Sequence, residues 1–260
     1  MNGAALSPGR LAGTIAVVAR NLRVWRRFFA SSMIGNLAEP FFYLLAFGYG
    51  LGALITDVGG ISYTAFFTPG LVISTSMYAA TFEGTYGTFT RLSPQRTFEG
   101  ILATPVSVRE VVLGEILYAT IKAVAGGIAV LGVVAVFGLV SSPAALLMPV
   151  LCALVGLLFA GLAVLVSGLS PTYDFFTYYF TLVITPLFMF SGIFFPLNQL
   201  PLWVQLASWF NPLTHATDAA RALFAGNLDQ ALLLDLTWLA AVSILPVLPA
   251  TSFLRRRLVH

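Results

Sequence analysis

Long apolar runs alternate with short polar segments along nearly the whole chain. A helix crosses the hydrocarbon core of a bilayer with about 20 residues, and six runs reach that length. They cover residues 28–55, 61–82, 111–140, 145–169, 175–195 and 232–254. The pattern therefore predicts an all-α integral membrane protein with six transmembrane helices.

Composition supports this fold class. Of the 260 residues, 58% are hydrophobic and only 9% are charged, whereas a soluble domain carries roughly 25% charged residues. Only lipid tolerates so much apolar surface on the outside of a fold. We expect one membrane domain over residues 28–254, preceded by a cytoplasmic segment over residues 1–27 and followed by a basic cytoplasmic tail over residues 255–260.

The distribution of arginines predicts the orientation. Five arginines precede the first run, three lie between the second and third runs and three follow the last run, whereas Arg221 alone falls on the opposite side. Cytoplasmic segments of membrane proteins carry such an excess. Both termini and segment 84–110 are therefore expected in the cytoplasm. Because the basic residues lie between apolar runs and not on a soluble surface, nucleic-acid binding is not expected.

Residues 10–27 predict a helix with one apolar stripe and one basic side. At roughly 100° per residue, five apolar side chains share one side and the arginines occupy the other. The apolar positions are Leu11, Ile15, Val18, Leu22 and Trp25. Such a helix lies flat on an anionic membrane surface, where it contacts lipid. A helix that docks on a soluble partner is the alternative.

The cytoplasmic segment after the second run predicts a short helix of its own. Ser93-Pro94 suits a helix start and Thr104-Pro105 suits a stop, which gives a helix over residues 94–103. Ser107 and Glu110 then have the spacing of a capping box at the start of the third span. A short charged helix between two spans suits docking of a soluble partner, and a plain solvated turn is the alternative.

Residues 196–230 predict an unusual element on the outer side. Tryptophan is typical of the membrane interface, and the segment contains Trp203 and Trp209. Proline prevents one continuous helix, and three prolines interrupt the segment, at Pro196, Pro201 and Pro212. We expect an outer re-entrant hairpin that closes the mouth of a pathway, because irregular backbone at the membrane must be buried or face water.

A few charged residues lie inside or beside the runs. Glu39 lies roughly 16 Å along the first span, where a charge faces a cavity or a partner by default. The alternatives are a protonated side chain or one that reaches the membrane surface. Glu83, Glu115 and Lys122 lie near the cytoplasmic end, where ion pairs are the favoured interpretation. His215 is expected to be structural, because no second ligand stands at zinc spacing.

The sequence predicts no catalytic residue, no metal site and no cofactor. It contains no G-x-x-x-x-G-K-[ST] phosphate loop and no G-x-S-x-G or H-E-x-x-H motif. The chain is therefore not expected to be an enzyme. If it uses ATP, a partner chain must hydrolyse it.

The segment from Phe188 to Arg221 resembles the signature of ABC-2 type transporter permeases. The residues at the family spacing are Ser191-Gly192, Pro196, Asn211-Pro212-Leu213-Thr214-His215 and Arg221. The resemblance covers nearly the whole chain and is strongest to the nodulation protein J (NodJ) branch. The residues that carry the branch resemblance are Glu39-Pro40-Phe41, Phe82-Glu83-x-x-Tyr86-Gly87 and Glu99-Gly100-Ile101-Leu102-Ala103-Thr104-Pro105.

The resemblance implies partners and residue roles. Two permeases would pair with two copies of a separate, NodI-like ATP-binding subunit in the bacterial inner membrane. The short cytoplasmic helix would be the coupling helix, with ATPase contacts at Arg91, Pro94, Arg96, Glu99, Thr104, Pro105 and Arg109. Candidates for the translocation pathway are Glu39, Glu83 and Tyr86. The outer re-entrant element would be marked by Gly192, Pro196, Asn211, Pro212, His215 and Arg221.

The resemblance also implies a cargo class, namely a lipo-chitooligosaccharide (Nod factor) or a similar glycolipid or polysaccharide. The sequence leaves open an exporter of another amphiphile, such as a drug or a lipid. Two other classes also remain: an ion-coupled secondary transporter that uses Glu39, and a membrane assembly factor without cargo. The identity of the cargo and the dimer interface are not readable from the sequence.

Overall fold

The computed structural model describes residues 11–55 and 57–258, and within these ranges the chain is helical apart from turns and one isolated bridge between Val58 and Ile61. In the labels below, η marks a π- or 3₁₀-helical segment. The first half contains α1 (Ala12–Arg27), α2 (Phe29–Tyr43), η1 (Leu44–Gly50), η2 (Leu51–Ala53), α3 (Tyr63–Phe82), η3 (Glu83–Gly87), α4 (Thr88–Leu92), α5 (Thr97–Leu102) and α6 (Val108–Val136). The second half contains η4 (Pro143–Leu147), α7 (Met148–Leu169), α8 (Asp174–Tyr179), η5 (Phe180–Ile184), α9 (Thr185–Met189), η6 (Leu197–Gln199), α10 (Leu202–Trp209), α11 (Pro212–Ala225), α12 (Gln230–Ile244) and α13 (Val247–Leu258).

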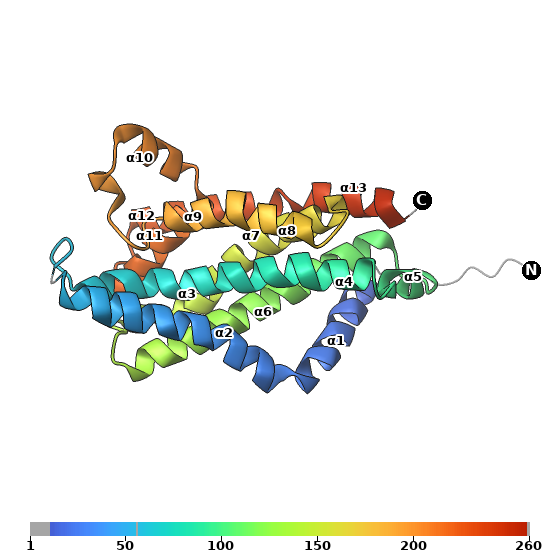
Figure 1. Ribbon diagram of the computed structural model, residues 1–260, viewed down its shortest axis with the longest axis horizontal. Coiled ribbons are helices and arrows are strands. Elements are labelled where there is room, and N and C mark those ends of the chain that lie inside the picture. Colours follow the sequence, from blue (N-terminus) through green and yellow to red (C-terminus); the bar gives the residue numbers. More distant parts are fainter. Residues whose placement is uncertain (1–10, 56, 259–260) are drawn as a thin grey trace, which may run out of the picture.

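These segments join into long rods that form an elongated bundle (Figure 1). The pairwise contacts place α3, α6 and α7 at its centre, with α1 packed on α6 and with α13 packed on α7. Figure 1 shows α1, α5 and the end of α13 at one end of the bundle, and α10 with the turn between η2 and α3 at the other. We call these the α5 end and the α10 end.

Three helices among the described residues are long and apolar enough to cross a membrane. They are Val108–Val136, Pro143–Leu169 and Gln230–Leu258, and they coincide with the third, fourth and sixth apolar runs. A shorter apolar helix, Asp174–Met189, occupies the fifth run. The first and second runs are also helical, over α2 to η2 and over α3. The all-α membrane fold class predicted from the sequence is thereby confirmed.

Small residues let the central helices approach closely. A Cβ on Gly127 of α6 would lie 2.4 Å from the Ser76 Oγ of α3, and a Cβ on Gly156 of α7 would lie 2.8 Å from the Ala123 Cβ of α6. Helices in lipid associate through such close packing, because burying apolar side chains against one another gains little there. Large apolar side chains meanwhile face outward, with Val136 and Leu146 at least 80% exposed. The exterior therefore suits lipid.

Several runs contain breaks that the apolar pattern did not reveal. The π-helical segments η1, η3 and η5 interrupt three of the rods, and such segments are frequent at functional sites. The sixth run is divided into α12 and α13 by a turn at Leu245-Pro246, because proline lacks the N–H that a continuous helix needs.

The predicted start of the cytoplasmic helix at Pro94 is wrong. The helix α5 begins only at Thr97, after Arg96 in a left-handed conformation with φ of 49°. The Ser93 and Gln95 N–H groups instead donate to the carbonyls of Phe89 and Thr90 and so close α4. The Ser93-Pro94 pair that resembles a helix start thus belongs to the end of the preceding helix.

The predicted capping box at the start of the third span is confirmed. The Ser107 hydroxyl accepts from the Glu110 N–H at 3.3 Å, and the Glu110 carboxylate accepts from the Ser107 N–H at 2.7 Å. At the C-terminus, Arg255, Arg256 and Arg257 belong to the last turns of α13. The predicted segments over residues 1–10 and 259–260 lie outside the described residues.

Candidate functional site

The helix α5 presents charge to the surroundings. Phe98 is fully buried and anchors the helix, whereas Arg96 and Glu99 point outward and form an exposed ion pair of 3.1 Å. The remaining exposed positions of the predicted contact set flank the helix, at Pro94, Thr104, Pro105 and Arg109. An exposed ion pair contributes little to stability, so these charges are free to serve a partner.

Arg91, the first residue of that predicted set, is placed differently. Its side chain is only 14% exposed, and its guanidinium lies 2.7 Å from Glu83 and 2.6 Å from Glu115. Lys122 lies 2.6 Å from the other oxygen of Glu83. We call Glu83, Arg91, Glu115 and Lys122 the buried charge quartet. The ion pairs predicted for Glu83, Glu115 and Lys122 are thus present, and Arg91 ties α4 to α6.

The helix α1 docks on α6 through a face that sequence reasoning missed. Its buried side is Gly13, Thr14, Val17 and Asn21. The Asn21 side-chain amide donates to Glu115 at 2.8 Å, and Val17 packs on Gly114 so closely that a Cβ there would lie 2.7 Å away. The spacing of four residues between Gly13, Val17 and Asn21 was the available signal. Leu11 and Ile15 of the apolar stripe are more than 60% exposed and can contact lipid, whereas Val18, Leu22 and Trp25 are half-buried.

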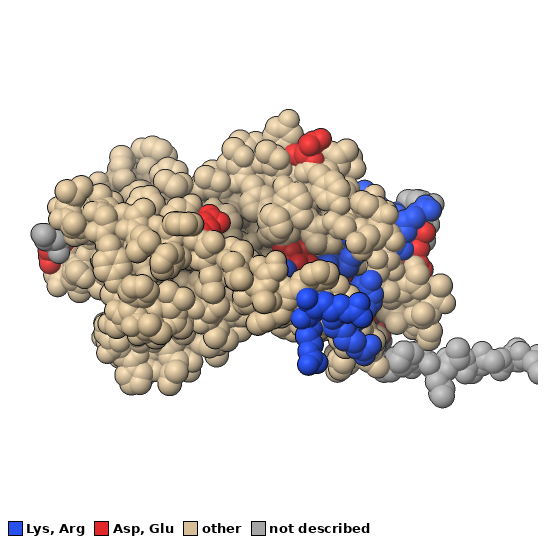
Figure 2. Space-filling view, turned by 60° about the horizontal axis from the view of Figure 1, so that its bottom comes forward, with Lys and Arg blue, Asp and Glu red and all other residues tan. Residues whose placement is uncertain are grey.

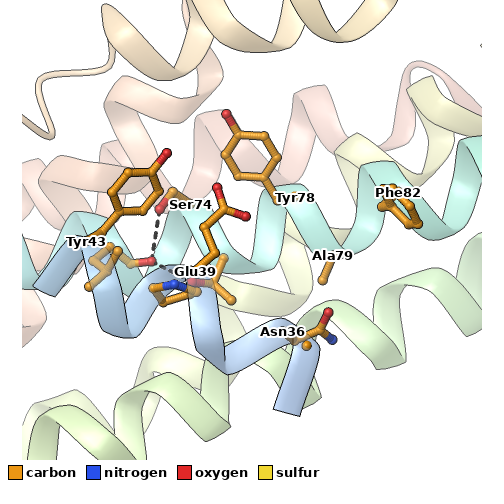
Figure 3. A pocket seen from close by; sticks show the side chains of 11 residues that line it. Asn36, Glu39, Tyr43, Ser74, Tyr78, Ala79 and Phe82 are labelled. Carbon is orange, nitrogen blue, oxygen red and sulfur yellow. Dashed lines mark hydrogen bonds between the residues drawn. The ribbon is translucent and has the colours of Figure 1, made fainter. Parts of the chain in front are cut away.

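Glu39 lines a cavity of about 140 Å³ between α2 and α3. Figure 3 shows Glu39 and Tyr43 of α2 pointing into the same space as Ser74 and Tyr78 of α3. Asn36, Thr75 and Phe82 also line this cavity. Glu39 is exposed in the bundle, so its carboxylate faces the cavity mouth and not a buried cation. The other two pathway candidates, Glu83 and Tyr86, line a second cavity next to it.

Residues of the outer signature hold α11 in place at the α10 end. Asn211 caps α11 by accepting from the Leu213 N–H at 3.0 Å, and its side-chain amide donates to the Leu187 carbonyl of α9 at 2.7 Å. Pro212 occupies the first turn of α11, where its missing N–H costs nothing. Pro196 leads into η6 in an extended conformation.

Arg221 and His215 tie the same helix to three further elements. The Arg221 guanidinium donates to the carbonyls of Phe66 and Gly192 and lies over the Phe66 ring, 3.8 Å from its centroid. Gly192 has a φ of 78°, which favours glycine. His215 lies 2.7 Å from Asp235 of α12 and 2.8 Å from the Trp209 carbonyl, and it stacks on Trp238. These contacts support the structural role expected for His215.

The charged groups are unevenly spread over the surface. Figure 2 shows the lysine and arginine side chains gathered at one end of the molecule, while the rest of the visible face is largely uncharged. A long apolar body with one basic end is typical of a helical membrane protein.

The chain belongs to the ABC-2 type transporter family, whose sequence profile matches residues 13–225. It is 40% identical to nodulation protein J of Rhizobium leguminosarum bv. trifolii over 97% of each chain. It is 41% identical to nodulation protein J of Rhizobium meliloti (strain 1021) over 94% of this chain and 93% of that relative. It is also 26% identical to the inner membrane transport permease YadH of Escherichia coli (strain K12), over 82% and 83% of the two chains. The resemblance to ABC-2 permeases and to nodulation protein J is thereby confirmed.

Proposed function

We propose that the chain is the permease subunit of an exporter that moves a lipo-chitooligosaccharide (Nod factor), or a similar glycolipid or polysaccharide, out across the bacterial inner membrane. A separate ATP-binding subunit of the NodI type powers it, and two permeases pair with two such subunits. The relatives named nodulation protein J support the cargo class. The observation that most supports a separate ATP-binding chain is α5, which is anchored by Phe98 and bears an exposed ion pair.

We assign one membrane span to each of the six apolar runs, with both termini and α5 in the cytoplasm. The lysine and arginine side chains at one end of the bundle support this orientation (Figure 2). The helix α1 would lie at the cytoplasmic surface, with its exposed stripe at Leu11 and Ile15 in lipid. The domain boundaries proposed are an interface segment over residues 1–27, a membrane domain over 28–254 and a basic tail over 255–260.

The residues around α5 divide into two roles in this proposal. Arg96, Glu99 and Arg109 are exposed and contact the ATP-binding subunit, with Pro94, Thr104 and Pro105 shaping the turns on either side. Arg91 acts one step further inside, because its guanidinium is held by Glu83 and Glu115. A push on α5 would reach α3 and α6 through that ion-paired arginine.

The pathway runs from the quartet toward the α10 end. Glu39 supplies a hydrogen-bond acceptor about midway, and Glu83 and Tyr86 line the cytoplasmic part. The segment from Gly192 to Arg221, with α10 and α11, forms the re-entrant element that closes the outer mouth. Charged and aromatic groups in an otherwise apolar bundle suit a cargo with a polar head and an acyl tail.

An uptake assay in inverted inner-membrane vesicles tests the proposal. Vesicles that contain the chain and its ATP-binding subunit should accumulate labelled lipo-chitooligosaccharide only with ATP. Uptake of other amphiphiles alone would favour a drug or lipid exporter. Uptake by the chain alone, driven by an ion gradient and lost in Glu39→Gln, would favour the ion-coupled alternative, which the cavity position of Glu39 motivates. If no amphiphile were taken up under any condition, the result would favour the remaining class, a membrane assembly factor without cargo.

A further inference from the structure

A second cavity, of about 370 Å³, lies at the α5 end between α1, the helical rod from α3 to α4, and α6. Arg20 of α1, Tyr86 of η3 and Tyr118 of α6 line three of its sides. This volume holds more than ten water molecules at roughly 30 Å³ each, so it admits a ligand the size of a sugar ring or two. We call it the α1 cavity.

The charges beneath the α1 cavity neutralise one another. Two carboxylates and two cations make up the buried charge quartet, and each carboxylate accepts from at least one cation at 2.7 Å or less. Each charged side chain of the quartet already has an oppositely charged partner inside the protein. A charged ligand would therefore gain little from interacting with the quartet. The other polar groups that line the cavity include the Gln95 amide, the hydroxyls of Tyr86 and the largely buried Tyr118, and the Arg20 guanidinium, which already donates to the Asn21 side chain at 2.9 Å.

Aromatic rings form one wall of the same cavity. The rings of Phe82 and Tyr86 have centroids 4.7 Å apart, and Phe82 is 60% exposed. Tyr86 is steadied from behind by Tyr173, whose ring stacks on it at 6.1 Å. Flat apolar faces beside amide, hydroxyl and guanidinium donors are the complement of an uncharged sugar, whose C–H faces pack on rings while its hydroxyls form hydrogen bonds.

The α1 cavity adjoins the Glu39 cavity. Phe82 lines both, and both lie along the same rod of α3 and η3. A head group bound at Tyr86 would therefore reach Glu39, Tyr43 and Tyr78 by moving past one side chain. The order of the two cavities from the α5 end toward the middle of the bundle is the order that outward movement requires.

The wall formed by α1 is joined to the coupling segment. Glu110 caps α6 directly after that segment, and a Cβ on Gly13 of α1 would lie 2.5 Å from its carboxylate. Asn21 of α1 is bonded to Glu115 one helical turn further on. A shift of the α6 start would therefore carry α1 with it and change the width of the cavity.

We propose that the α1 cavity is the loading site for the uncharged saccharide head of the cargo. This inference rests on the proposed export function and adds the first position at which the sugar binds. Tyr86 stacks on a sugar ring, Tyr118 and Gln95 form hydrogen bonds with it, and the acyl tail stays outside the cavity in lipid.

Calorimetric titration with chitotetraose, a soluble sugar without an acyl tail, tests this site. The full permease–ATPase complex in lipid nanodiscs is the sample. Tyr86→Ala should weaken binding about tenfold, and Tyr118→Phe, which removes one hydroxyl, should weaken it several-fold. Tyr86→Phe keeps the ring and should bind more tightly than Tyr86→Ala. Tyr178→Phe, at an exposed tyrosine of α8 that does not line the cavity, should bind like the unaltered protein.

Two results would overturn the inference: no chitotetraose binding by the unaltered complex, or equal affinity in all four variants. The vesicle assay separates this failure from failure of the proposed function. If ATP-driven export proceeds while cavity variants bind like the unaltered protein, the loading site is refuted and the export function stands. If Tyr86→Ala loses binding but no glycolipid is exported by any form, the site stands and the export function is refuted.

Discussion

The Arg91 guanidinium donates to Glu115 from two nitrogens, at 2.6 Å and 2.9 Å, across an interval of 24 residues. Arg91 lies in α4, directly before the segment that contains α5, and Glu115 lies in α6, which follows that segment. The helices on either side of α5 are therefore fastened to each other by a buried, charge-assisted pair. Such bonds are roughly twice as strong as neutral ones.

Removing Arg91 should destabilise the protein strongly. Arg91→Ala leaves Glu115 buried without its cation, and breaking a buried pair from one side costs about 3–5 kcal/mol. The thermal unfolding midpoint in detergent should fall accordingly. The double variant Glu83→Gln with Lys122→Met removes one charge of each sign, and its thermal unfolding midpoint should fall clearly less. An unfolding midpoint of Arg91→Ala equal to that of the unaltered protein would show that the quartet does not hold α4 to α6.

Adding one methyl group to Gly114 should push α1 off α6. The new Cβ of Gly114→Ala would lie 2.7 Å from Val17, and 3.3 Å from the Thr14 carbonyl. Overpacking of this kind costs about 1–3 kcal/mol. The matched control is Gly132→Ala, also in α6, where nothing lies within 4 Å and the better helix propensity should stabilise by up to about 1 kcal/mol. Unfolding midpoints that shift equally for the two variants would contradict the docking of α1.

Glu39→Gln should impair transport without affecting folding. The side chain faces a cavity and carries no ion pair among the described residues, so the amide fits where the carboxylate was. We expect export to fall by about tenfold, a loss of about 1.4 kcal/mol from the transport step. Asp174→Asn, at an exposed position of α8, is the control and should export normally. Normal export by Glu39→Gln would remove Glu39 from the pathway.

Arg221→Lys should loosen the outer segment although the charge is kept. A lysine has no planar fork with which to reach both the Phe66 and the Gly192 carbonyls. Hydrogen exchange of segment 192–211 should therefore become faster. Asp218→Asn breaks only an exposed pair of 3.3 Å and should change stability by less than about 1 kcal/mol. Unaltered exchange in Arg221→Lys would show that the arginine does not hold the segment.

Much of the fold is readable from local patterns. The apolar runs place the rods, and Ser107 with Glu110 marks the start of α6, because both signals depend on residues that are close in sequence. The prolines of segment 192–221 stand at the starts of its helices, with Pro196 before η6, Pro201 before α10 and Pro212 in the first turn of α11, and such helix starts are visible in the sequence.

The tertiary partners were less predictable. The pairing of Arg91 with Glu115 depends on how α4 and α6 pack against each other, and no local sequence pattern predicts that packing. The docking face of α1 was hidden because Gly13 and Asn21 are neither apolar nor basic, so they fell outside both stripes of the helical wheel. The false helix start at Pro94 arose because the same residue types also end α4.

The measurement that tests the central claim most directly is export by the double charge reversal Arg96→Glu with Glu99→Arg. These side chains are exposed and, within the part of the chain that the structure describes, form an ion pair only with each other, so folding and membrane insertion should be unchanged. In inverted vesicles with the ATP-binding subunit, we predict that ATP hydrolysis continues while ATP-dependent uptake of lipo-chitooligosaccharide is lost. Uptake at the rate of the unaltered protein would contradict the claim that α5 couples this permease to a separate ATPase.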